Sequence, residues 1–125
     1  MNKLLITFTT SDPERSEDLK NTLRNMLTEY DDINILKSQK ESIPKGAMAA
    51  DPISIGALAL AAISTLMPTI INAVKEIKLK NKDLSVKIKV KIDGKEIDVE
   101  FSEKLNKDEI ELLTQSFIDK LSLDS

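Results

Sequence analysis

Paired carboxylates are the side chains of this 125-residue chain that come closest to a catalytic pattern. Adjacent acids stand at Asp31 and Asp32 and again at Asp108 and Glu109. Two carboxylates held close together can serve as a general acid and a general base. The first pair, however, follows a predicted helix and the second begins one, where capping, the helix dipole and solubility explain acidic residues. We therefore expect no catalytic residues among them.

Other catalytic chemistries are excluded by composition, because the chain contains no Cys and no His. Thiol and imidazole catalysis, Ser-His-Asp triads, zinc sites and disulfide frameworks all require one of these residues. The three glycines, Gly46, Gly56 and Gly94, are too far apart to form a phosphate-binding loop. We expect a protein that is not an enzyme and that has no cofactor and no metal site.

The charge pattern argues against nucleic acid as a partner. The net charge is −3, and only four aromatic residues are available to stack on bases. Residues 75–95 hold 8 lysines against 3 acids, but the lysines at 87, 89 and 91 oppose a matching acidic series in the predicted hairpin. That face is typical of a solvated hairpin, since the two series largely cancel.

The predicted fold begins with a strand, a helix and a second strand. Residues 3–9 alternate as a strand, and Ser11 or Asp12 is placed to cap a helix over 13–29. Residues 33–36 form a short second strand, and a polar loop follows over 37–51. The crossover between the two strands should be right-handed if they are parallel.

A hairpin and a final helix close the chain. Apolar and charged residues alternate over 85–92 and 95–101, and Asp93 and Gly94 between them suit a two-residue turn. One register places Ile88 opposite Val99 on the apolar face and Lys89 opposite Asp98 on the charged face. Asn106 then caps the last helix, whose apolar stripe consists of Ile110, Leu113, Phe117 and Leu121.

Residues 52–74 carry no charge and are predicted to form an apolar helix, kinked near Pro68. Such a helix would be about 34 Å long at 1.5 Å per residue, enough to cross a bilayer core of roughly 30 Å. Polar residues such as Ser54, Thr65 and Asn72 sort away from the large apolar ones, which favours burial in a protein interface. Insertion into a membrane stays the alternative.

The order of these parts resembles the effector-associated constant component family of bacterial conflict systems. The features that match are the strand–helix–strand start, the loop over 44–48 (PKGAM), the small-residue helix 56–62 (GALALAA), the basic stretch 75–82, the hairpin turning at Asp93 and Gly94, and a last helix. The resemblance implies a non-enzymatic accessory protein that accompanies variable effectors, such as caspase-like or trypsin-like peptidases. It further implies a role in immunity, coupling the sensing of an invader to the effector.

We therefore expect a single α+β domain over residues 1–125, in the order β-α-β, apolar helix, hairpin, helix. Four strands should form one sheet with the helices packed on it, and the apolar segment 52–74 is an insertion between the second strand and the hairpin. We expect a homo-oligomer that binds an effector of the same system in the bacterial cytoplasm, with membrane association as the alternative. The predicted partner or membrane interface consists of Leu58, Leu60, Ile63, Met67 and Ile71, followed by a basic flank of Lys75, Lys78, Lys80 and Lys82.

Overall fold

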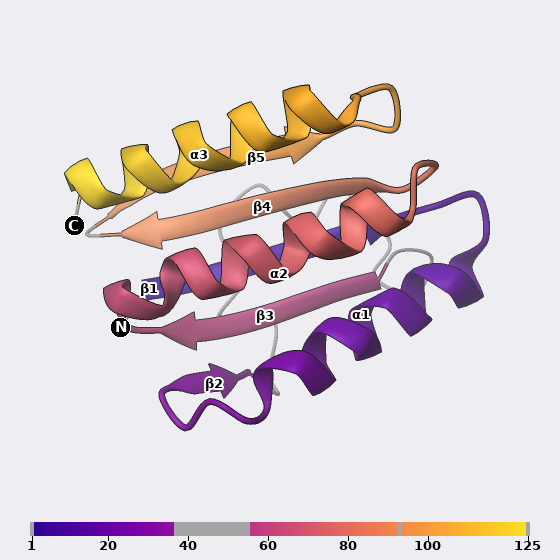
Figure 1. Cartoon of the computed structure of the whole chain (residues 1–125). Coiled ribbons are helices and arrows are strands. Elements are labelled where there is room, and N and C mark those ends of the chain that lie inside the picture. The colour runs from indigo at the N-terminus through magenta and orange to yellow at the C-terminus, as the bar shows by residue number, and fades with distance from the viewer. Residues whose placement is uncertain (1, 37–55, 93, 125) are drawn as a thin grey trace.

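The computed structural model describes residues 2–36, 56–92 and 94–124 (Figure 1). The predicted loop over 37–51 and the first residues of the predicted apolar helix lie outside these ranges. The elements are β1 (Asn2–Thr9), α1 (Pro13–Leu27), β2 (Ile33–Ile35), β3 (Gly56–Ala62), a short 3-10 helix (Ser64–Leu66), α2 (Met67–Lys80), β4 (Ser85–Ile92), β5 (Lys95–Phe101) and α3 (Lys107–Asp124).

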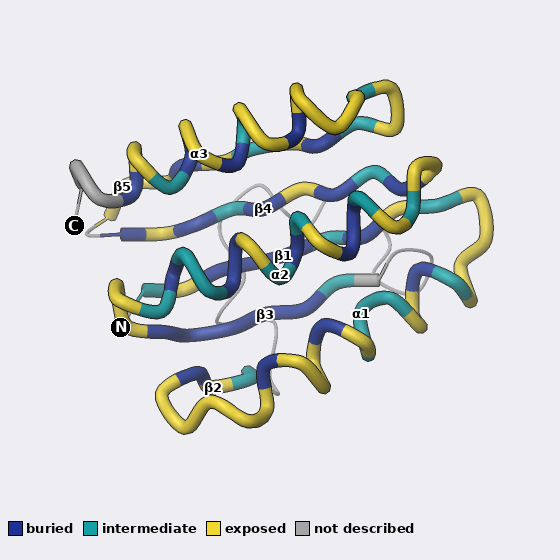
Figure 2. The backbone as a smooth tube through the Cα atoms, viewed as in Figure 1, coloured by how far each residue is buried: buried dark blue, intermediate teal, exposed yellow. Residues whose placement is uncertain are grey.

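The helices packed on an antiparallel sheet confirm the predicted α+β class. Within the described residues the sheet has five strands in the order β2-β3-β1-β4-β5, and every neighbouring pair is antiparallel. The α-helices of the described residues, α1, α2 and α3, lie on one face of it (Figure 1). The core lies between these two layers, and the central strands β1, β3 and β4 carry most of its buried strand residues (Figure 2).

The strand–helix–strand start is confirmed, but its two strands are not neighbours. Because β3 lies between β1 and β2, these two strands run parallel without pairing with each other. The α1 helix is capped by Asp12, whose Oδ1 accepts a hydrogen bond from the backbone N–H of Glu14 at 3.0 Å. Pro13 occupies the first turn, where a missing N–H costs nothing.

The hairpin follows the predicted register in every pair. Val90 pairs with Ile97 and Ile88 with Val99 on the helix side, while Lys89 lies opposite Asp98 on the outer face. Gly94 has a φ of 82°, the left-handed conformation that the two-residue turn requires and that glycine adopts without strain.

The prediction of one long apolar helix over 52–74 is wrong. Its described part forms strand β3, then the short 3-10 helix, and only from Met67 onward the helix α2. Ala and Leu alternate over 57–61, so both leucines project to the helix-covered face, and the strand fits between β1 and β2. Pro68 lies in the first turn of α2 and marks where that helix begins, rather than a kink within it.

The sequence predicted a sheet of four strands, and β3 is the additional fifth strand. Among the described residues, no helix is long and apolar enough to cross a membrane.

Candidate functional site: a lysine-lined pocket between α2 and α3

Most of the predicted interface residues lie in the core. Leu58 and Leu60 in β3 are 2% and 0% exposed, and Met67 and Ile71 in α2 are 2% and 0% exposed. Ile63, at 38%, is the one member of the predicted set that stays on the surface. Buried side chains cannot contact a partner while the domain stays folded. Among the described residues, these four belong to one hydrophobic core that also contains residues of α1, β1 and β4.

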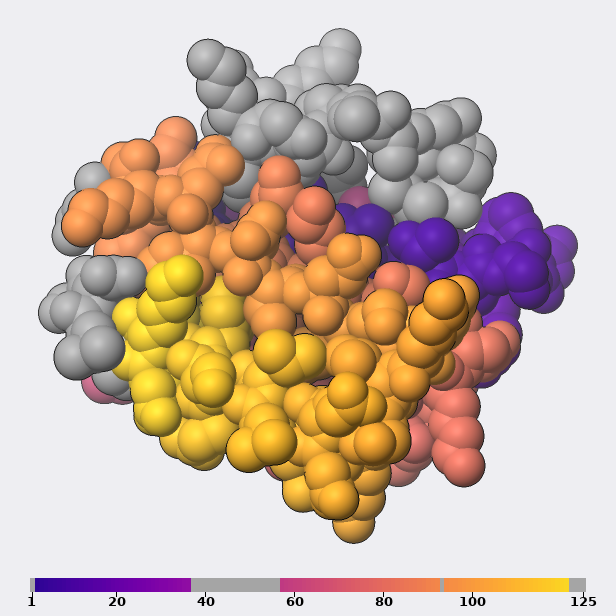
Figure 3. Space-filling view, turned by 90° about the horizontal axis from the view of Figure 1, so that it is seen from above, coloured from indigo at the N-terminus to yellow at the C-terminus, as the bar shows by residue number. Residues whose placement is uncertain are grey.

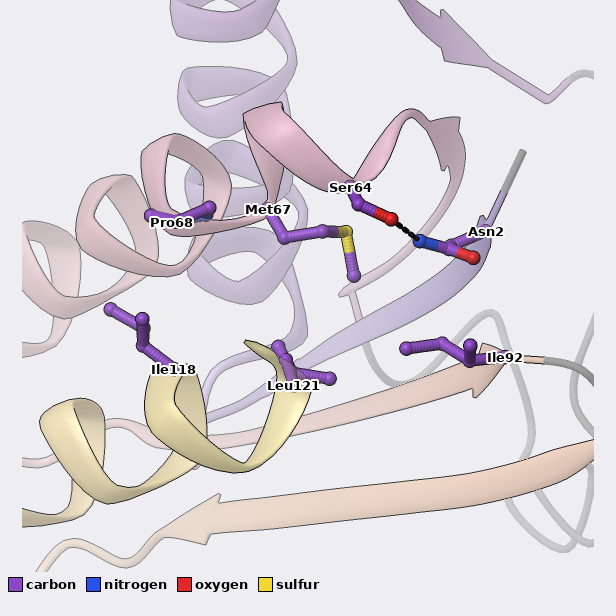
Figure 4. Close-up of a pocket in the computed structure, with 7 residues that line it drawn as sticks. All are labelled: Asn2, Ser64, Met67, Pro68, Ile92, Ile118 and Leu121. Atoms are coloured by element: carbon purple, nitrogen blue, oxygen red, sulfur yellow. Dashed lines mark hydrogen bonds between the residues drawn. The ribbon is translucent and has the colours of Figure 1, made fainter. Parts of the chain in front are cut away.

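Figure 4 shows how Met67 is enclosed. Its side chain projects into a small space between the start of α2 and the end of α3, beside Ile92, Ile118 and Leu121. Asn2 Nδ2 donates a hydrogen bond to Ser64 Oγ at 3.0 Å at the edge of this space. The free volume is about 20 Å³, room for one water and too small for a ligand.

The predicted basic flank divides into residues with different surroundings. Lys80 and Lys82 are exposed, Lys75 is half-buried and Lys78 is only 1% exposed. Lys78 and Lys82 line a larger open pocket of about 630 Å³ at the end of α2, whereas Lys75 and Lys80 do not. The pocket is completed by residues that precede or begin α3. Its full lining is Lys78, Leu79, Lys82, Glu103, Lys104, Leu105, Asn106, Lys107 and Ile110.

The charge of this lysine pocket is strongly positive, with four lysines and one glutamate among its lining residues. Within the described part of the chain, Lys82, Lys104 and Lys107 take part in no ion pair. Glu103 likewise pairs with none of them. Ammonium groups without a protein partner are available to an anionic ligand.

Lys78 is the most deeply placed of the four lysines. Its Nζ donates a hydrogen bond to the backbone carbonyl of Lys82 at 3.0 Å, where the chain turns from α2 toward β4. Burial lowers the pKa of the Lys78 ammonium, and the negative charges of Asp83 and Glu103 only partly oppose that effect. A buried ammonium held by one carbonyl is an incompletely compensated charge, which an anion in the pocket would stabilise.

The turn after α2 is anchored by α1. Arg15 forms an ion pair with Asp83, and its Nη2 donates to Asn81 Oδ1 at 2.7 Å. Asn81 in turn donates through Nδ2 to the carbonyl of Ile77 at 2.8 Å. The hydrogen bond from Arg15 lowers the pKa of Asp83. The Asp83 carboxylate is thus shared between Arg15, with which it pairs, and the more distant charge of Lys78.

The start of α3 is closed by its own side chains, as the sequence predicted. Asn106 Oδ1 accepts from the Glu109 N–H at 2.8 Å, and Glu109 Oε1 accepts from the Asn106 N–H at 3.1 Å. This reciprocal capping box occupies part of the helix terminus. The attraction for an anion therefore comes from the lysine side chains rather than from the end of the helix.

The acid pairs considered for catalysis lie apart from one another in the fold. Asp31 and Asp32 are exposed in the turn between α1 and β2, and Glu109 belongs to the capping box. In the described ranges, no three Asp, Glu, Cys or His side chains gather as a metal site. No protein-family model, curated protein or solved structure matches the chain. Its function is therefore inferred from the fold and from the pocket.

The buried charge leads to a prediction for Lys78→Met. A lysine whose folded pKa is lowered holds its proton less tightly in the folded chain than in the unfolded chain. The wild type should thus gain stability as the pH rises through the lowered pKa toward the ordinary value of 10.5. Below that range the charged ammonium is a cost, so the variant should be more stable than the wild type at pH 7, on the order of 1 kcal/mol.

Urea denaturation of both proteins at pH 7 and pH 10 measures this difference, which should shrink at the higher pH. A variant that is less stable by the same amount at both pH values would contradict the assignment of a destabilising buried charge.

Proposed function

We propose that this chain is a non-enzymatic accessory component of a bacterial conflict system, located in the cytoplasm, and that it binds an acidic segment of its effector in the lysine pocket. The observation that carries the proposal is the pocket itself, where four lysines line about 630 Å³ and none of the four forms an ion pair among the described residues. The resemblance in the layout of the sequence supplies the biological setting, with residues 56–62 as a strand where that layout had a helix.

A peptide segment suits the pocket better than a single small anion. Pockets of about 300–1,000 Å³ accommodate ligands with many atoms, and this one is open to the surface. Leu79, Leu105 and Ile110 line it together with the lysines, so its wall contains both apolar and cationic groups. An acidic segment with an occasional apolar residue would contact both kinds of group, and flexible lysines can follow carboxylates at variable positions.

The membrane-inserting alternative and the apolar partner interface both relied on Leu58, Leu60, Ile63, Met67 and Ile71, and all of these except Ile63 lie in the core of the domain. The lysine pocket does not depend on them, so the proposal rests on the pocket.

Binding of a fluorescein-labelled hexaglutamate peptide, followed by fluorescence anisotropy, tests the pocket. Lys82→Glu/Lys104→Glu reverses two exposed pocket charges and should weaken binding about tenfold or more, equivalent to about 1.4 kcal/mol. The matched control Lys95→Glu/Lys120→Glu makes the same change of net charge at exposed lysines outside the pocket and should bind nearly as the wild type does. Raised salt should weaken wild-type binding, because exposed charges are screened.

Equal losses of peptide affinity in the two double variants would show that the peptide is attracted to net charge alone. That result would overturn the proposal that the pocket is the binding site. The same variants then test binding of the effector itself, by co-expression with a peptidase encoded beside this chain. We expect the peptidase to co-purify with the wild type and with the control, and to be lost from the pocket variant.

A further inference from the structure

We propose that the free edge of β5 is a second docking site, which accepts an extended partner segment whose lysines or arginines alternate with apolar residues. β5 is the last strand of the sheet, and it pairs with β4 on one side. In the part of the chain that the structure describes, no strand pairs with its other side. Figure 3 views the molecule from the side of α3 and β5, and the orange atoms of the hairpin reach the surface beside the yellow atoms of α3.

The outer face of β5 is acidic and available. Glu96, Asp98 and Glu100 are exposed, and none of their carboxylates takes part in a hydrogen bond or an ion pair within the described residues. They lie opposite lysines of β4 at positions 91, 89 and 87. A strand added at the free edge would bring basic side chains to the other flank of the same carboxylates. Opposite charges at facing positions stabilise neighbouring strands.

The helix-covered side of β5 requires apolar residues in the partner. Val99 is half-buried there, and Leu113 of α3 is also half-buried against the core. Ile118 of α3 points toward Pro68 and Met67 of α2 (Figure 4). Leu113 lies about 140° around the helix from Ile118, and so on the flank away from α2. Apolar side chains of an added strand would cover Val99 and Leu113.

A second copy of β5 does not meet these requirements. Two antiparallel β5 strands centred on Asp98 would place Asp98 opposite its own copy and Glu96 opposite Glu100. Like charges at facing positions destabilise the pairing, and charged edges of this kind keep sheets from self-association. β4, which pairs with the other edge of β5, has the sequence SVKIKVKI. A partner strand at the free edge would face the same acidic and apolar side chains, so we expect the same alternation of basic and apolar residues in it.

The backbone of β5 allows a specific test. Along an antiparallel strand, the N–H and C=O groups of alternate residues point to opposite neighbours. In a hairpin with a two-residue turn, the pair that adjoins the turn, Ile92 and Lys95, is hydrogen-bonded. The backbone N–H and C=O groups of Glu96, Asp98 and Glu100 therefore point to the free side. Proline at position 98 therefore removes a free N–H from the open edge and leaves the pairing with β4 intact. Proline is tolerated in edge strands at such positions.

The test uses the full-length protein and a labelled peptide of sequence SVKIKVKI, with SVEIEVEI as the matched control. We expect the lysine peptide to bind at least tenfold more tightly than the glutamate peptide. Asp98→Pro should weaken binding of the lysine peptide tenfold or more. The double variant Glu96→Lys/Glu100→Lys, which keeps every backbone group, should reverse the preference between the two peptides.

The pocket variant Lys82→Glu/Lys104→Glu should bind the lysine peptide as the wild type does, which separates this site from the proposed function. Equal affinity for the two peptides, no binding of either, or dimerisation of the chain through β5 would overturn the proposal. Asp98→Pro variants that fold and still bind the lysine peptide at wild-type affinity would overturn it as well.

Discussion

Replacing Leu60 with Asp should unfold the chain or lower its free energy of unfolding by more than about 4 kcal/mol. Leu60 is fully buried in β3, where it lies opposite Leu4 of β1 on one side and Ile35 of β2 on the other. A carboxylate there would have to lose its hydration without gaining an ionic partner. Urea denaturation followed by circular dichroism measures the change.

Ile63→Asp is the matched control for Leu60→Asp, because Ile63 directly follows β3 and is 38% exposed. It should cost under about 1 kcal/mol. The interpretation of residues 52–74 as an assembly helix predicts instead that Asp at position 60 leaves a folded domain. A Leu60→Asp variant with a wild-type unfolding transition would contradict the strand assignment of β3.

Ile88→Lys should destabilise the fold by several kcal/mol, because Ile88 is fully buried in β4 and faces the helices. Its neighbour Lys89 points to the outer face and is half-buried opposite Leu5 and Asp98. Lys89→Thr should therefore cost under about 1 kcal/mol. Thermal unfolding of the two variants compares them, and equal losses would show that the register of the hairpin is wrong.

Local patterns were sufficient to predict the hairpin and the last helix. In the hairpin, one register satisfies the apolar pairs and the charged pairs together, and Gly94 supplies the turn. In α3, Asn106 and Glu109 form the capping box at the helix start that their spacing predicts. Both elements depend on residues close together in the chain, so their sequence pattern contains most of the determining interactions.

Strand β3 was not predicted, because what decides it is non-local. Its residues, GALALAA, are rich in Ala and Leu, which favour helices in isolation. Their alternation fits a strand, but a strand is stable only with neighbours, and β1 and β2 supply them from far away in the chain. Pro68 fits both a kink and a helix start, and the pairing of residues 56–62 with β1 and β2 is what separates these two structures.

The sequence predicted only two of the four lysines of the pocket. Lys78 and Lys82 belong to the predicted basic flank, but Lys104 and Lys107 join them through the packing of α3 against α2. One local signal could have identified Lys78, since it follows Val74 by four residues and so continues the buried stripe of α2. A lysine in an apolar stripe indicates either a buried charge or a pocket, and here both are present.

Mapping where an acidic segment binds is the decisive measurement for the lysine pocket. The measurement is an amide NMR titration of the ¹⁵N-labelled full-length protein with hexaglutamate peptide. We predict saturable shifts concentrated at Leu79, Lys82 and residues 103–110, and their loss in Lys82→Glu/Lys104→Glu. Shifts centred on the lysines of β4, or none at all up to millimolar peptide, would contradict it.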